Sequence, residues 1–237
     1  MQRQSDAYTL LFAVIICVIC SFTVTLCAEG LRSRQEQNVS LDKKKNILKA
    51  AHVQSQSWQN MPPAELLDFF DQKIGVVVLN PKGDFVNGIK PEDIKDGEQL
   101  YPLYVYKEQG AIMAYCLPIQ GKGLWSTLKG YLAIDADAKT IRGITFYAHK
   151  ETPGLGAEIE KEWFQNNFTG KSIWDDKEQV LRPPKLVKAV VKKRMKPQDE
   201  PYYVDSITGA TMTSQGVSDV LDKELNKYEP FLKKVRK

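Results

Sequence analysis

The chain has 237 residues, of which 43% are hydrophobic, so it is long enough for one domain of moderate size and an additional segment. Its 33 basic and 29 acidic residues are well mixed and give a formal net charge of +4. Because the basic residues form neither a stripe nor an arginine-rich cluster, the sequence indicates no nucleic-acid partner.

After a short tail of residues 1–7, an uncharged apolar run extends from Tyr8 to Ala28 and contains neither glycine nor proline. As a helix it would be about 31 Å long, which matches the hydrocarbon core of a bilayer. The run is longer than the apolar region of a usual signal peptide, and Leu26 stands where a lipoprotein signal needs a small residue before Cys27. The sequence therefore predicts a retained transmembrane helix over residues 8–28. The flanking charges hardly favour either orientation.

Cysteines are concentrated in this apolar run. Cys17 and Cys20 have the spacing of an iron–sulfur motif, but ligation would require further cysteines from another subunit. Packing as small apolar side chains is the simpler interpretation. Cys116 is the one cysteine after the run, so the rest of the chain has no internal disulfide.

The remaining chain is predicted to contain a helical linker over residues 29–73 and a domain over residues 74–237. Helices are expected at Ser40–Gln56, from Pro62-Pro63 onward, at Ala157–Asn167 and from Val217 onward. Predicted strands are Ile74–Leu79, Leu103–Tyr106, Ala111–Pro118, Gly130–Ile134, Ile141–Ala148 and Leu186–Lys192. Consecutive strands with flanking helices predict an α+β fold with a mixed, largely antiparallel sheet.

The last predicted helix has one apolar face. At helical spacing this face carries Val217, Val220, Leu221, Leu225, Tyr228 and Leu232. These side chains are the candidates for contact with the sheet.

A hydroxyl and small residues come just before this helix. Thr211 follows Thr208-Gly209-Ala210 and precedes Met212 and Thr213, at the predicted entry to the helix. Unpaired N–H groups and the positive end of the helix dipole suit a phosphate there, and Gly209 and Ala210 leave room for a large ligand. Ordinary helix capping is the alternative interpretation.

Two loops add candidate ligand contacts. In Gln120–Ser126, Gly121 and Gly123 permit close backbone approach, while Trp125 could cover a flat ring or pack into the core. In His149–Gly156, Gly154 and Gly156 leave backbone N–H groups accessible, and Leu155 could pack on a ring. A plain connection between a strand and a helix would explain the second loop equally well.

Hydrolysis and metal binding are poorly supported. His149, Asp205 and Ser206 or Ser214 could be grouped as a triad, but the sequence lacks a G-x-S-x-G nucleophile motif. The two histidines are almost a hundred residues apart, so no metal site is predicted.

The segment Asp205-x-x-Thr208-Gly209-Ala210-Thr211 resembles the flavinylation motif of the FMN-binding domain family. With the two loops, the resemblance extends over most of residues 74–225. It implies that Thr211 carries FMN through a phosphoester bond, and that Asp205 serves the flavin transferase. The position of Thr208 is usually serine in this family, a change that keeps the hydroxyl. The implied cofactor-binding residues are Gly121, Gly123, Leu124, Trp125, Glu151, Thr152, Gly154, Leu155, Gly156, Thr208, Gly209, Ala210, Thr211, Met212 and Thr213.

The family includes the C subunit of the Na+-translocating NADH:quinone oxidoreductase and the G subunit of the Rnf complex. Gly123–Ser126 and Lys45–Leu48 resemble the quinone reductase version. This implies an electron carrier within a multi-subunit enzyme of the bacterial inner membrane. It also implies an amino terminus inside the cell, a domain on the periplasmic side and a flavin transferase as a maturation partner. A membrane-tethered scaffold without redox function is the alternative from a different class.

Overall fold

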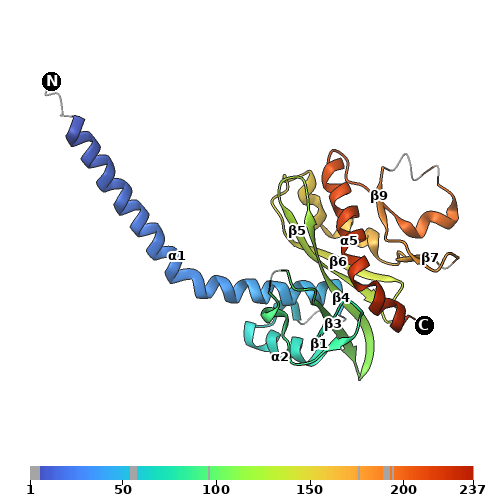
Figure 1. Ribbon diagram of the computed structural model, residues 1–237. Coiled ribbons are helices and arrows are strands. Elements are labelled where there is room, and N and C mark those ends of the chain that lie inside the picture. Colours follow the sequence, from blue (N-terminus) through green and yellow to red (C-terminus); the bar gives the residue numbers. More distant parts are fainter. Residues whose placement is uncertain are drawn as a thin grey trace. The chain divides into compact units, whose positions relative to one another are not determined.

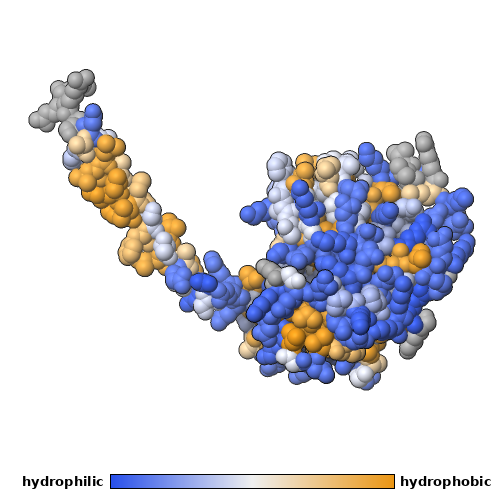
Figure 2. Space-filling view, viewed as in Figure 1, coloured by the Kyte–Doolittle hydropathy of each residue, from blue (hydrophilic) through white to orange (hydrophobic). Residues whose placement is uncertain are grey.

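The computed structural model describes residues 6–53, 58–95, 97–175, 177–188, 193 and 195–236. The chain forms two compact units, Met1–Asp42 and Lys43–Lys237. The described part of the first unit belongs to helix α1 (Asp6–Ala50), and its apolar side chains are exposed. Among the described residues, α1 is the one helix long and apolar enough to cross a membrane. Its apolar stretch is the orange part of the helix in Figure 2.

Helix α1 joins the two helices that were predicted separately at residues 8–28 and from Ser40 onward. Its course continues through residues 29–39, a stretch without proline in which Arg32 pairs with Glu36 one turn later at 3.1 Å. The helix ends in a Schellman motif: His52 N donates to Lys49 O and Val53 N to Leu48 O, both at 3.1 Å, and His52 has a φ of +45°. The prediction that a helix continues beyond Ala51 is therefore wrong at His52, while residues 54–56 lie outside the described part.

The second unit is built on a six-stranded antiparallel sheet in the order β2-β1-β3-β4-β5-β6 (Figure 1). Its strands are β1 (Ile74–Leu79), β2 (Phe85–Val86), β3 (Tyr101–Glu108), β4 (Ala111–Lys122), β5 (Thr127–Asp135) and β6 (Ile141–Ala148). Gln109 and Gly110 join β3 to β4 with positive φ angles of 49° and 83°, as a tight two-residue hairpin turn requires. The predicted antiparallel α+β architecture is confirmed.

Helices cover both faces of this sheet. On one face, Tyr115, Leu117 and Ile119 of β4 belong to a core cluster with helix α5 (Thr211–Val235). Tyr228 in α5 also donates a 2.8 Å hydrogen bond to the carbonyl of Pro102. The opposite face receives the end of α1, where Thr145 of β6 donates to the carbonyl of Asn46 at 3.3 Å.

The remaining elements are short. They are α2 (Pro63–Lys73), α3 (Glu162–Gln165), the 3-10 turns η1 (Trp58–Asn60), η2 (Pro91–Asp93), η3 (Gly156–Glu160), η4 (Asn166–Phe168) and η5 (Pro197–Tyr202), and strands β7 (Trp174–Asp175), β8 (Val180–Leu181), β9 (Lys185–Val187) and β10 (Tyr203–Asp205). Strands β7 and β8 pair antiparallel, whereas β9 and β10 pair parallel. Strand β10 is followed directly by residues 206–210, which lead into α5.

Several predicted boundaries change. The helix expected at Ala157–Asn167 is divided into η3, α3 and η4, because Lys161 adopts an extended conformation with φ −80° and ψ 144°. Strand β9 covers residues 185–187 of the region predicted as Leu186–Lys192, and residues 189–192 lie outside the described part. Helix α5 begins at Thr211 rather than Val217. Its predicted apolar face is confirmed: Val217, Val220, Leu221, Leu225, Tyr228 and Leu232 are all at most 2% exposed.

Candidate functional site

Three segments meet at the carboxylate of Glu151. The backbone N–H of Trp125, in the tip of the β4–β5 hairpin, donates to Glu151 Oε1 at 3.0 Å. The hydroxyl of Thr213, in the first turn of α5, donates to Glu151 Oε2 at 2.6 Å. Glu151 itself follows β6 and is 5% exposed. The sheet and α5 thus bring the two predicted loops and the Thr211 segment together.

Glycines provide the space for this carboxylate. A Cβ on Gly123 would lie 2.6 Å from Glu151 Oε1, and a Cβ on Gly156 would lie 2.8 Å from Oε2 and 2.5 Å from Thr213 Oγ1. Neither contact is compatible with a side chain. These glycines therefore allow the loops to close on each other, a packing role that adds to the close ligand approach expected from the sequence.

The loop after β6 is fixed by further hydrogen bonds. Lys150 N donates to Ser126 Oγ at 2.7 Å, which ties this loop to the hairpin tip. Glu151 N donates to His149 Nδ1 at 3.2 Å, and His149 Nε2 lies 3.4 Å from Glu160 Oε2. With Nδ1 accepting from a backbone amide, His149 orients the loop in this structure.

The start of α5 has unused hydrogen-bond donors. Ala210 occupies the N-cap position and provides no side-chain cap, and the first intrahelical bond runs from Ser214 N to Ala210 O at 2.9 Å. The N–H groups of Thr211, Met212 and Thr213 have no acceptor within the described part of the chain. Thr211 and Thr208 are exposed. The hydroxyl of Thr211 therefore stands at an uncapped helix N-terminus that can accept an anion.

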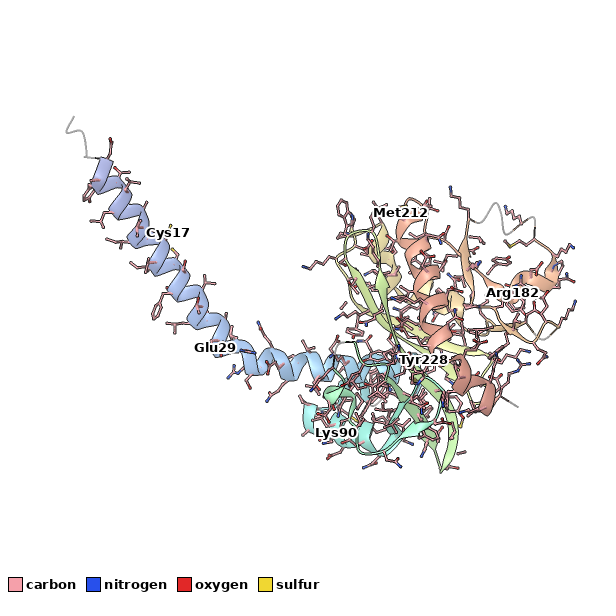
Figure 3. All side chains as sticks on the ribbon, in the orientation of Figure 1. Cys17, Glu29, Lys90, Arg182, Met212 and Tyr228 are labelled. Carbon is pink, nitrogen blue, oxygen red and sulfur yellow. The ribbon has the colours of Figure 1, made fainter. Side chains whose placement is uncertain are left out.

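Exposed apolar side chains surround this helix start. Leu124, Trp125 and Leu155 are 45%, 69% and 42% exposed, and Met212 is 62% exposed. Leu155 also lies against the segment before α5, because a Cβ on Gly209 would be 3.0 Å from its Cδ2. Figure 3 labels Met212 at the start of α5, and Figure 2 shows orange, apolar atoms at this end of the domain. The arrangement is an open apolar surface beside an anion-binding helix end.

Most of the predicted cofactor residues belong to this surface or its supports. Gly121 has a different environment: it belongs to β4 and pairs with Leu128 of β5, and a Cβ there would lie 2.5 Å from Val220 Cγ2 of α5. Sequence reasoning did not identify Ser126 or Gly216 as parts of the assembly. A small residue on the inner side of α5 was the available signal for Gly216, and the available signal for Ser126 was its place in the Gly123–Ser126 segment.

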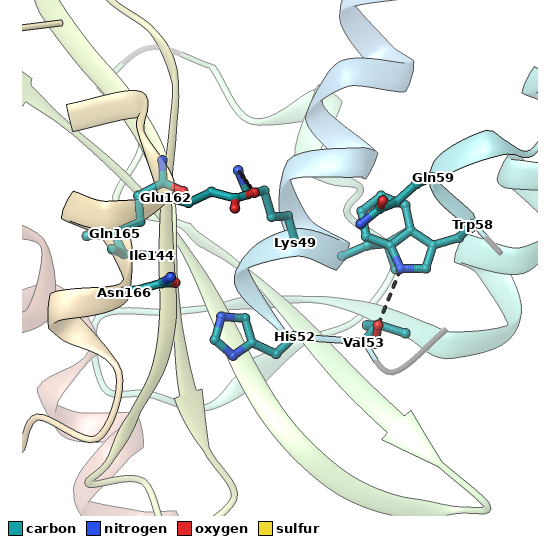
Figure 4. A pocket seen from close by; sticks show the side chains of 10 residues that line it. Lys49, His52, Val53, Trp58, Gln59, Ile144, Glu162, Gln165 and Asn166 are labelled. Atoms are coloured by element: carbon teal, nitrogen blue, oxygen red, sulfur yellow. Dashed lines mark hydrogen bonds and ion pairs between the residues drawn. The ribbon is translucent and has the colours of Figure 1, made fainter. Parts of the chain in front are cut away.

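A cavity of about 260 Å³ lies elsewhere in the second unit (Figure 4). It is lined by Leu48, Lys49, His52, Val53, Trp58, Gln59, Ile144, Glu162, Gln165 and Asn166. Lys49 Nζ lies 3.6 Å from Glu162 Oε1, and Trp58 Nε1 donates to Val53 O at 3.3 Å. None of the predicted cofactor residues lines this cavity.

The open surface fits a ligand with a flat, partly apolar ring and a phosphate, as FMN has. Its apolar side chains could cover ring atoms, and the free N–H groups of α5 could bind phosphate oxygens. Residues 123–226 match a family model described as an FMN-binding domain. The fold and the site thus define a flavin-binding domain that follows an apolar amino-terminal helix.

Similarity to known proteins extends over the whole chain. The C subunit of the Na(+)-translocating NADH-quinone reductase of Yersinia pestis is 36% identical, with 99% of this chain and 95% of that protein covered. The C subunit of the Pseudomonas aeruginosa enzyme is 31% identical, with 100% and 98% covered. The crystal structure of the C subunit from Parabacteroides distasonis is 34% identical, covers 85% of this chain and 96% of its own, and has a TM-score of 0.71. The chain belongs to the family of C subunits of the Na(+)-translocating NADH-quinone reductase, and the preference for this family over its Rnf counterpart is confirmed.

Proposed function

We propose that this chain carries FMN as an electron-transfer subunit of a membrane-bound Na+-translocating NADH-quinone reductase, with the FMN phosphate esterified to Thr211. In this linkage the Thr211 oxygen loses its proton and bonds to the flavin phosphorus. A flavin transferase supplies the FMN as one half of a phosphoanhydride such as FAD. The P–O–P bond breaks as the Thr211 ester forms, so the other half leaves as a phosphate (AMP in the case of FAD). The observation that carries the assignment is the exposed Thr211 hydroxyl at an uncapped helix N-terminus.

The helix start supports the phosphate end of this proposal. Three consecutive backbone N–H groups, at Thr211, Met212 and Thr213, are available to phosphate oxygens in the described part of the chain. The helix dipole favours negative charge at the same place. Gly209, with a φ of +81°, and Ala210 add almost no bulk beside Thr211, which suits the approach of a transferase.

The two loops support the ring end. Trp125 and Leu155 expose apolar surface next to α5, and Leu124 and Met212 extend this surface. Thr152 and Gly154 are exposed in the same loop as Leu155 and complete the proposed contact set. When bound, FMN supplies the redox chemistry, while the chain sets its orientation and solvent access. Thr211 therefore tethers the cofactor and takes no part in turnover.

The membrane arrangement is also part of the proposal. The apolar part of α1 anchors the chain in the bacterial inner membrane, with the flavin domain on the periplasmic side. A covalent bond suits a carrier outside the cytoplasm, because a dissociated cofactor would be diluted and lost. The electron partners are other subunits of the same complex. This role differs from that of a tethered scaffold, which needs no flavin.

An intact-mass measurement tests the attachment. The chain is coexpressed with a flavin transferase, and we expect the mass of one FMN phosphodiester in the wild type and in Thr208→Val, although the latter is modified to a lower extent. Thr211→Val should have the unmodified mass and no flavin fluorescence on a denaturing gel. Fluorescence that survives in Thr211→Val would disprove the attachment site, and an unmodified wild-type chain would favour the scaffold function.

A further inference from the structure

We propose that Glu151 is the positioning residue of the flavin site, holding the β4–β5 hairpin tip and the first turn of α5 together before any flavin is attached. This inference rests on the proposed function, because the position that it controls is that of the ring and phosphate contacts. It differs from the cofactor contact that the sequence motif predicts for Glu151. In this proposal the Glu151 carboxylate holds the two segments whose residues contact the cofactor.

The hydrogen bonds of Glu151 carry the proposal. Its Oε1 accepts from Trp125 N at 3.0 Å and its Oε2 accepts from Thr213 Oγ1 at 2.6 Å, so each carboxylate oxygen has a donor from a different segment. The side chain is 5% exposed, which leaves water little access to either bond. Bonds from neutral donors to a shielded carboxylate are among the stronger ones in proteins.

The surrounding backbone is shaped for this side chain. Gly123 and Gly156 approach the two carboxylate oxygens so closely that a Cβ on either would lie within 2.8 Å of one of them. Residue 151 therefore fills a space closed on both sides by glycine. A shorter side chain would leave both donors without an acceptor in a region that excludes water, a costly arrangement.

The two donors belong to parts of the site with different tasks. Trp125 presents an indole that is 69% exposed, and Thr213 belongs to the helix turn whose N–H groups would bind phosphate. Because one carboxylate holds both, displacement of the hairpin tip changes the ring contact and the phosphate contact together. Glu151 thus fixes the distance between the ring contact and the phosphate contact before flavin is attached.

Amide hydrogen exchange on the full-length chain, produced without a flavin transferase, tests this clamp directly. Glu151 Oε1 is the acceptor of the Trp125 N–H within the described part of the chain, so the protection of this amide depends on Glu151. We expect exchange about tenfold faster, or more, in Glu151→Ala. Glu151→Gln should stay close to wild type, because its amide can accept from Trp125 and donate to Thr213. Exchange in Glu151→Ala within about twofold of wild type would overturn the proposal.

Thr213 provides a second, milder test if Glu151→Ala does not fold. Thr213→Val removes the hydroxyl that holds Oε2, and it should accelerate exchange at Trp125, a residue that Thr213 itself does not hold. Thr213→Ser should restore the protection. Unchanged Trp125 exchange in Thr213→Val would contradict a clamp that couples the two segments.

The flavin midpoint potential of the flavinylated chain separates positioning from mere stability. We expect a shifted potential in Thr213→Val and in Glu151→Ala, and a value near wild type in Thr213→Ser. Wild-type potentials in both of the first two variants would overturn the positioning role. Intact mass reports the attachment separately, so an unmodified wild-type chain would reject the proposed function while leaving the exchange result on Glu151 standing.

Discussion

Gly216 of α5 lies directly against the backbone at the end of β4, where a Cβ on the glycine would stand 2.6 Å from the carbonyl oxygen of Lys122 and 3.3 Å from Gly123 Cα. Both neighbouring atoms are backbone atoms and cannot rotate away. The close approach allows α5 to begin beside the hairpin tip, and it thereby sets the position of Thr211 relative to Trp125.

Gly216→Ala should therefore destabilise the domain. At an unconstrained helix position this change would stabilise the protein by about 1 kcal/mol, through the better helix propensity of alanine. Here the clash should reverse the sign and lower the free energy of unfolding by about 1–3 kcal/mol. Urea denaturation of residues 43–237 measures it. Gln215→Ala, at the exposed neighbouring position, is the matched control, with an expected change below about 0.5 kcal/mol. Equal stability in both variants would contradict the steric argument.

Trp125→Ala and Leu155→Ala should leave flavin attachment largely intact, because neither side chain holds Thr211. Both should change the flavin absorbance spectrum or midpoint potential, since they are proposed to cover the ring. Trp163→Ala is the control: this tryptophan is 51% exposed but belongs to α3. Unaltered spectra and potentials in both loop variants would exclude these ring contacts.

The stability of the domain should decrease through His52 as the pH falls below about 7. Burial, followed by the charge of Arg142, lowers the pKa of His52 below its ordinary value of 6.5, against an opposing effect of Asp135. The folded state therefore prefers neutral histidine. This contribution is present above pH 6.5 and is lost as the pH falls through the lowered pKa.

Replacement of His52 tests this pH dependence. His52 has a φ of +45°, so asparagine, which tolerates the left-handed region, is the suitable substitution. In urea denaturation at a series of pH values, His52→Asn should show a smaller loss of stability on acidification than wild type. The same loss in both proteins would remove His52 as the cause.

Removal of the first unit should release a folded domain. The truncated chain 43–237 keeps Ile47 and Leu48, which are 2% and 0% exposed, so it should be soluble and cooperatively folded. Full-length protein should stay with the membrane fraction after an alkaline wash. A chain that starts after Val53 loses those buried side chains and should unfold at a lower temperature. Full-length protein in the supernatant would contradict anchoring by α1.

Local pattern predicted much of the fold. The bounds of β1 and β6 agree with the sequence prediction, and the face of α5 follows its apolar spacing. The joined helix α1 and the divided segment at Lys161 were not predictable in this way. Helix continuation through residues 29–39 depends on weak local preferences, and the extended conformation of Lys161 interrupts a segment in which no glycine or proline marks a break.

The site was predictable as a set of segments and not as an assembly. Small residues and hydroxyls before a helix mark Thr211, and glycine-containing loops mark the two other segments. The bond between Glu151 and Thr213 joins residues 62 positions apart. No periodicity encodes such a pairing, because it results from the sheet register and the close packing of α5. The sequence therefore did not predict that Gly123 and Gly156 make room for a carboxylate.

The exposed side chains of Leu124, Trp125, Leu155 and Met212 have a consequence for the chain before maturation. Until a planar cofactor covers these side chains, they leave an apolar patch exposed to water, and such patches promote self-association. The proposed flavinylation would then do more than install a redox centre: it would complete the surface of the protein. Cells that make this protein faster than they can modify it would accumulate a chain prone to aggregation and to proteolytic disposal.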